Sequence, residues 1–159
     1  LEIVRRRVRR AGAVGLAHPA YATILLGAGR DILGFLFTAD ALALRLRRDA
    51  RIAEAAAARL AALIRCDRLL IAPTADPEAL REGLAAAHGP VIDAVGAEPA
   101  DPAPPAGRSA IRALLDPRRL PGDAVVMVGD DARERDWAEA ANLARFIGAE
   151  AYFSGAGDD

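Results

Sequence analysis

The chain has 159 residues with 21 basic and 22 acidic side chains, and its net charge of −1 argues against a general nucleic-acid binder, which would present a basic face. A single cysteine excludes a disulfide within these residues and a zinc site built on paired cysteines. No apolar run reaches the roughly 20 residues that a membrane-spanning helix needs. The sequence therefore predicts one domain with its own core and no membrane span.

The chain begins with an arginine-rich segment. Residues 5–10 read Arg-Arg-Arg-Val-Arg-Arg, and a solvated linker or helix face is the expected structure. The chain starts at Leu1 and its one methionine is Met127, so we expect a removed N-terminal domain or a protein partner for this segment. The predicted parts are an arginine-rich segment or linker (1–20), an α/β domain (21–155) and a tail (156–159).

Apolar runs and helix-period patterns alternate along the rest of the sequence. Short apolar runs predict five strands, at 21–27, 67–74, 90–96, 124–129 and 151–153. Longer periodic or apolar stretches predict helices at 31–48, 51–65, 76–89, 108–115 and 133–147. Strands that alternate with helices favour parallel pairing with right-handed crossovers. The predicted fold is a single doubly wound α/β domain of the flavodoxin or Rossmann type, with a mostly parallel five-stranded sheet and helices on both faces.

Local signals mark the helix boundaries and the turns that follow the strands. Asp76 precedes Pro77 and Glu78, as at a capped helix start, and Gly89 ends the same helix. Asp31 is also a predicted N-cap, whereas Asp130 and Asp131 are predicted either to cap the following helix or to hold a metal or phosphoryl group. Ligands of such sheets bind at the turns after the strands, here 27–31, 73–76, 96–101 and 129–133.

Two common nucleotide-binding motifs are missing. Gly27 and Gly29 fit the first two glycines of the dinucleotide fingerprint, but the third position falls on Ile32. The Gly-Lys-Ser/Thr sequence of a P-loop is also absent. Neither a nicotinamide or flavin site nor a P-loop nucleotide site is therefore predicted.

The segment from Gly29 to Gly34, Gly-Arg-Asp-Ile-Leu-Gly, and the end of the chain carry a family resemblance. They resemble cobalamin-binding domains of the flavodoxin-like kind, which have Asp-x-His-x-x-Gly before an apolar helix and end with Val-Gly-Gly and Ile-Gly-Ala-Asp-Ala-Tyr. The corresponding residues here are Val-Gly129-Asp130 and Ile147-Gly-Ala-Glu-Ala-Tyr152. In this register Asp31 replaces the cobalt-ligating histidine, and a carboxylate is a poor substitute for imidazole.

This resemblance implies a regulatory or accessory domain rather than an enzyme. Such a domain would act as a tetrapyrrole sensor or a protein-docking module in the bacterial cytoplasm, and cobalamin, haem and no cofactor stay open. The cofactor crevice implied by the resemblance comprises Gly29, Arg30, Asp31, Gly34, Thr74, Gly129 and Asp130.

The segment Val128-Gly-Asp-Asp131 resembles the last motif of the haloacid dehalogenase phosphatases, an apolar strand followed by Gly-Asp-Asp or Gly-Asp-x-x-x-Asp and a helix. The nucleophile motif of that family, Asp-x-Asp-Gly after the first strand, has no counterpart after the predicted strand 21–27. The resemblance therefore implies a truncated or inactive phosphatase. It implies Mg²⁺ ligation by Asp130, Asp131 and Asp136, with Arg108 at the position of the family lysine and Thr38 at that of its Ser/Thr.

Three further predictions concern single residues and one surface. His18 and His88 are expected at the surface or near a helix end, with axial ligation of haem or cobalamin as the alternative. Trp137 is expected in the core or at an interface. The third functional hypothesis is a structural interaction domain that docks through the apolar surface of the helix at 51–65.

Overall fold

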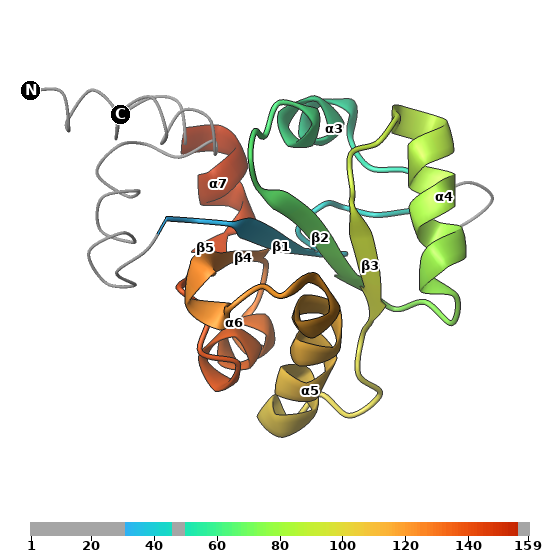
Figure 1. Cartoon of the computed structure of the whole chain (residues 1–159). Coiled ribbons are helices and arrows are strands. Elements are labelled where there is room, and N and C mark those ends of the chain that lie inside the picture. The colour runs from blue at the N-terminus through green and yellow to red at the C-terminus, as the bar shows by residue number, and fades with distance from the viewer. Residues whose placement is uncertain (1–30, 46–49, 156–159) are drawn as a thin grey trace, which may run out of the picture.

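The computed structural model describes residues 31–45 and 50–155, which form one five-stranded, all-parallel sheet with helices on both faces (Figure 1). The strand order is β3-β2-β1-β4-β5. This arrangement confirms the predicted doubly wound α/β fold. The strands are β1 (Gly34–Thr38), β2 (Asp67–Ala72), β3 (Ala94–Ala97), β4 (Val125–Gly129) and β5 (Arg145–Gly148).

The helices form two layers around the sheet (Figure 1). One layer contains α3 (Glu54–Ala61), α4 (Pro77–His88) and α7 (Ala149–Gly155), and the other contains α5 (Pro104–Leu115) and α6 (Ala132–Ala140). Two short 3-10 helices, η1 (Asp116–Arg118) and η2 (Gly122–Ala124), connect α5 to β4. No helix among the residues described is long and apolar enough to cross a membrane.

Successive residues of the central strand β1 enter opposite cores. Phe35 and Phe37 pack in the core beneath α3, α4 and α7, whereas Leu36 packs in the core beneath α5 and α6. The same alternation divides β4, where Val126 and Met127 enter different cores. Because side chains of a strand alternate between its faces, a strand with helices on both sides is apolar at every position.

The predicted helix at 31–48 is wrong, because residues 34–38 form β1. The run Gly-Phe-Leu-Phe-Thr is buried along its whole length, so its sequence has no polar face by which a strand could be recognised. Asp31 is consequently no N-cap: its Oδ1 accepts a hydrogen bond of 2.8 Å from the backbone N–H of Ile32. The predicted strand at 21–27 lies outside the described residues.

The end of the chain also differs from the prediction. The expected helix at 133–147 stops at Ala140, where Asn142 adopts a left-handed backbone with φ of 54°, and β5 follows. The expected strand at 151–153 lies inside α7. The signals around α4 are confirmed, since the Asp76 side chain accepts a hydrogen bond from Ala79 N–H and Gly89 has φ of 81°.

Candidate functional site

The candidate site lies where β1 and β4 end side by side. The chain leaves β1 toward β2 on one side and leaves β4 toward β5 on the other, so the two outgoing connections diverge. Ligands of open α/β sheets bind at this point of divergence, at the carboxyl ends of the strands. Thr38 and Asp40 follow from β1, and Asp130 and Asp131 follow directly after Gly129 of β4.

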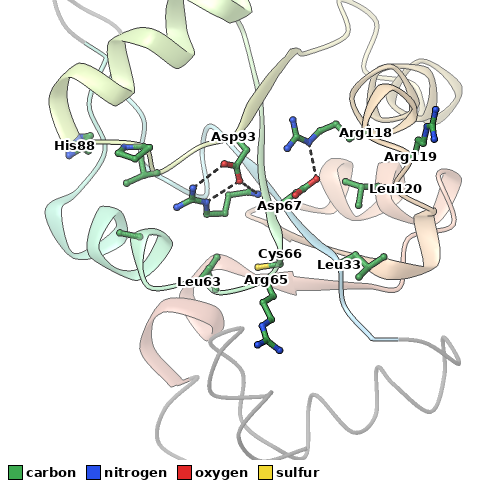
Figure 2. Close-up of a pocket in the computed structure, with 14 residues that line it drawn as sticks. Leu33, Leu63, Arg65, Cys66, Asp67, His88, Asp93, Arg118, Arg119 and Leu120 are labelled. Carbon is green, nitrogen blue, oxygen red and sulfur yellow. Dashed lines mark hydrogen bonds and ion pairs between the residues drawn. The ribbon is translucent and has the colours of Figure 1, made fainter.

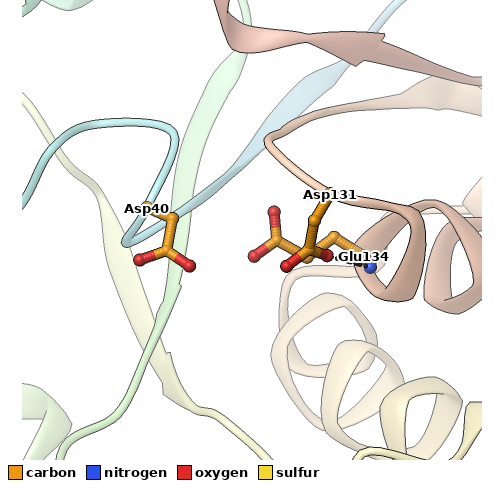
Figure 3. Close-up of side chains that lie close together, drawn as sticks. All are labelled: Asp40, Asp131 and Glu134. Carbon is orange, nitrogen blue, oxygen red and sulfur yellow. Dashed lines mark hydrogen bonds between the residues drawn. The ribbon is translucent and has the colours of Figure 1, made fainter.

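Three carboxylates from these two connections converge at this edge (Figure 3). Asp40, Asp131 and Glu134 each offer an oxygen, and these oxygens lie within 4.8 Å of one another. Asp40 and Asp131 are exposed and Glu134 is buried. The residues that meet here come from segments far apart in the sequence, and the parallel pairing of β1 with β4 brings them together.

Local structure fixes two of these carboxylates. Asp131 is the N-cap of α6, and its Oδ1 accepts a hydrogen bond of 2.9 Å from the backbone N–H of Glu134. The Oε1 of Glu134 accepts 2.9 Å from the Thr38 hydroxyl and 2.7 Å from the backbone N–H of Asp130. Both hydrogen bonds go to the same oxygen, so the second oxygen, Oε2, keeps its lone pairs for another partner.

Burial is the main influence on the protonation of the site. Burial raises the pKa of Glu134 above its ordinary value; the hydrogen bonds from Asp130 and Thr38 oppose this shift, and the charges of Asp131 and Asp40 add to it. Burial likewise raises the pKa of Glu98, against the charge of Arg133 and with that of Asp40 and Asp131. A bound cation would lower both pKa values, because it stabilises the ionised carboxylates.

Among the described residues, Arg133 places a positive charge beside the cluster. Its Nη2 lies 3.5 Å from Glu98 Oε1, 3.8 Å from Asp131 Oδ2 and 3.8 Å from Glu134 Oε2. Its Cζ lies 4.9 Å from the ring centroid of Trp137. Trp137 is buried, as predicted, and its indole N–H donates to the backbone oxygen of Pro102 at 2.9 Å.

The Glu134 carboxylate lies so close to the backbone at the end of β4 that this position requires a glycine. A Cβ added at Gly129 would lie 2.4 Å from the Phe146 ring and 3.0 Å from Glu134 Oε1. A side chain at this position would push both groups away. The glycine therefore admits the carboxylate to the strand end.

The dimensions of the carboxylate cluster suit a cation that prefers oxygen ligands. Two oxygens on opposite sides of an ion are separated by twice the metal–oxygen distance, about 4.2 Å for Mg²⁺ and roughly 4.6–5.2 Å for Ca²⁺. The carboxylate oxygens of the cluster lie within 4.8 Å of one another, a spacing compatible with either ion. Carboxylates are the ligands that both ions select.

The structure gathers some predicted site residues and separates others. Thr74, Gly129 and Asp130 follow strands at the carboxyl edge, whereas Asp31 and Gly34 lie at the amino end of β1. The crevice expected from the cobalamin-like resemblance is therefore divided between opposite edges of the sheet. Gly29, Arg30 and His18 lie outside the described residues.

The carboxylate cluster contains one of the three metal ligands expected from the phosphatase resemblance. Asp131 belongs to the cluster, but Asp130 and Asp136 are exposed and are not among its members. Glu134 and Asp40 take part instead. Glu134 stands four residues after Asp130, at the spacing of the Gly-Asp-x-x-x-Asp form of the motif, and that spacing was the available signal.

Two other expectations concern side chains away from the cluster. His88 ends α4 as predicted, but its side chain is buried rather than superficial, and its Nε2 accepts a hydrogen bond of 3.1 Å from Ile52 N–H. The apolar side of α3 faces the core through Ala56, Ala57 and Leu60. This part of the predicted docking face is therefore buried in the domain itself, whereas Ile64, within the predicted helix at 51–65, is 55% exposed.

A cavity of about 800 Å³ lies at the opposite, amino edge of the sheet (Figure 2). Its central charges neutralise one another: Arg68 pairs with Asp93 at 3.0 Å and Arg118 pairs with Asp67 at 2.9 Å. Burial alone would raise the pKa of Asp93, but the hydrogen bonds and charge of Arg68 hold it below its ordinary value. These pairs connect the starts of neighbouring elements, so the carboxyl edge is the stronger candidate for ligand chemistry.

Comparisons with protein-family models, curated proteins and solved structures found no match for this chain. The functional interpretation therefore depends on the geometry of the site.

Proposed function

We propose that the carboxyl edge of this sheet binds a divalent cation such as Mg²⁺ through Asp40, Asp131 and Glu134. The observation that carries the proposal is the convergence of these carboxylates where β1 and β4 end together. The proposed role is that of an accessory domain that binds a phosphorylated ligand through the cation and does not hydrolyse it. Mg²⁺ retains open coordination positions in such sites, and phosphate oxygens commonly fill them.

The resemblance to the haloacid dehalogenase phosphatases supports this proposal once β1 is recognised as the first described strand. The family places Asp-x-Asp-Gly after its first strand, and here β1 ends in Thr38-Ala39-Asp40-Ala41. Thr38 thus stands at the place of the nucleophilic aspartate, and Asp40 at that of the second aspartate. Thr74, after β2, is a better counterpart of the family Ser/Thr than Thr38 is.

The environment of Thr38 argues against covalent phosphoryl transfer. Its side chain is 2% exposed, its hydroxyl donates to Glu134, and its oxygen accepts a hydrogen bond of 3.2 Å from Ala41 N–H. A buried hydroxyl with both partners in place is a poor nucleophile compared with an exposed carboxylate. We therefore expect ligand binding without an aspartyl-phosphate intermediate.

Calorimetric titration of the chain with Mg²⁺ and Ca²⁺ tests this proposal. Asp131→Asn keeps the N-cap, because asparagine caps helices as well as aspartate does, but it removes a charged ligand. Asp136→Asn, on the exposed side of α6, is the matched control. We expect saturable binding that Asp131→Asn weakens by roughly tenfold or more, no change with Asp136→Asn, and no hydrolysis of p-nitrophenyl phosphate. Equal affinities in the two variants would refute the proposed site.

A further inference from the structure

The guanidinium of Arg133 lies beside the carboxylates that would hold a cation. Its Nη2 faces Glu134 Oε2 and Asp131 Oδ2, at 3.8 Å from each. Glu134 Oε1 already accepts hydrogen bonds from Thr38 and Asp130, so Oε2 is the oxygen left for a metal ion. The arginine and a metal ion would thus compete for the same oxygen.

The contacts of Arg133 with the cluster are those of a replaceable partner. All three Nη2–oxygen distances lie between 3.5 and 3.8 Å, longer than a charge-assisted hydrogen bond of about 2.8 Å. The Nε of Arg133 is buried and has no hydrogen-bond partner among the described residues. The guanidinium therefore balances charge here without forming the short, bidentate pair that arginine makes in a fixed salt bridge.

Arg133 also has anchors that do not belong to the carboxylate cluster. Glu98 follows β3 and lies nearest to Nη2, at 3.5 Å, and the Trp137 ring lies beneath the guanidinium. Both contacts can persist when Nη2 moves away from Glu134. A small rotation of the Arg133 side chain would therefore move Nη2 away from Glu134 and Asp131 while the contacts with Glu98 and Trp137 persist.

We propose that Arg133 is the resident counter-ion of this site and that an incoming divalent cation displaces it toward Glu98. This inference rests on the proposed function, because it presupposes that the cluster binds a cation. Arg133 then sets the affinity of the site, since binding must replace an existing positive charge. Glu98 has the opposite effect, because it holds the displaced guanidinium.

Opposite effects of two substitutions in the full chain test this inference. Mg²⁺ affinity is measured by calorimetry, and the fluorescence of Trp137, the only tryptophan, reports movement of the guanidinium. We expect Arg133→Gln to tighten Mg²⁺ binding roughly threefold to tenfold and Glu98→Gln to weaken it roughly threefold. Arg135→Gln is the control, because Arg135 lies on the same helix but over the Phe146 ring.

The experiment distinguishes a failure of the inference about Arg133 from a failure of the proposed cation site. If the unaltered chain binds Mg²⁺ and Arg133→Gln leaves the affinity unchanged or lowers it, the inference about Arg133 is wrong and the cation site stands. If neither the unaltered chain nor any variant binds Mg²⁺ while circular dichroism shows that all are folded, the proposed function is wrong, and this inference is wrong with it.

Discussion

The hydroxyl of Thr38 donates a hydrogen bond of 2.9 Å to the carboxylate of Glu134, which lies 96 residues further along the chain. Both side chains are buried, at 2% exposure each, and this bond joins the end of β1 to the first turn of α6. The bond therefore couples the two connections that make up the candidate site. A change in the charge of either residue should affect both stability and cation binding.

Replacing Glu134 with alanine should destabilise the domain far more than replacing it with glutamine. Alanine leaves the buried Thr38 hydroxyl and the half-buried Asp130 N–H without their acceptor, which costs about 2–4 kcal/mol of unfolding free energy. Glutamine keeps an acceptor oxygen for both donors, so we expect a change within about 1 kcal/mol. Urea denaturation measures both values, and equal losses would show that the hydrogen bonds at Oε1 contribute little.

Thr38→Asp should produce a domain that depends on cations for its stability. The new carboxylate would face Glu134 without a proton to donate, so we expect a loss of about 2–3 kcal/mol at neutral pH without metal. Saturating Mg²⁺ should recover much of this loss, because the ion neutralises the added charge.

Thr38→Val is the control for the Mg²⁺-dependent stability expected of Thr38→Asp. Valine removes the same hydroxyl and adds no charge, so its stability should respond to Mg²⁺ no more than that of the unaltered chain. Thermal unfolding with and without Mg²⁺ measures the responses, and an identical Mg²⁺ effect in the aspartate and valine variants would contradict the prediction.

The raised pKa of Glu134 predicts a definite pH dependence. A carboxyl whose pKa is higher in the folded state than its ordinary value of 4.5 favours folding when protonated. This contribution is complete below the ordinary value and is lost as the pH rises through the folded pKa. The unaltered chain should therefore lose stability relative to Glu134→Gln as the pH rises above 4.5 in the absence of divalent cations.

Asp93 does not interfere with this comparison. Its pKa is lowered in the folded state from an ordinary value of 3.8, so its contribution is lost only as the pH falls through a range below that value. Denaturation of both chains at several pH values measures the difference. A constant difference above pH 4.5 would mean that folding does not raise the pKa of Glu134.

The packing of α5 against α6 predicts that Gly107→Ala is strongly destabilising. A Cβ at Gly107 would lie 2.2 Å from the Trp137 ring, so the indole would have to move and would strain its bond to Pro102. We expect a loss of about 3 kcal/mol. Gly83→Ala in α4, whose added Cβ meets nothing closer than 3.4 Å, should instead gain about 0.5–1 kcal/mol. Similar effects of the two substitutions on thermal unfolding would contradict this packing.

The sequence predicted those elements that carry local boundary signals. The predictions of the fold class, β4 and α4 are confirmed. β4 and α4 could be predicted because a glycine, a proline or a capping aspartate marks their ends. The strand β1 was mistaken for part of a helix, because a central parallel strand is apolar on both faces and leucine-rich residues follow it. The roles of Thr38 and Asp40 were missed with it, since their importance depends on where β1 ends.

The remaining members of the site depend on contacts between distant segments. Glu134 at the third position of α6 has the spacing of an ordinary helix cap, which gives no indication that its side chain is buried against Thr38. Glu98 and Arg133 meet only because β3 and α6 follow different strands of one sheet. Pairings of this kind are set by topology and carry no local sequence signal.

The most direct test of the cation site is anomalous scattering from a crystal of the chain soaked in Mn²⁺, an ion that accepts the same oxygen ligands as Mg²⁺. We expect an anomalous peak within about 2.5 Å of carboxylate oxygens of Asp40, Asp131 and Glu134. An anomalous peak elsewhere, or no peak beside these three carboxylates at saturating Mn²⁺, would contradict the proposed cation site.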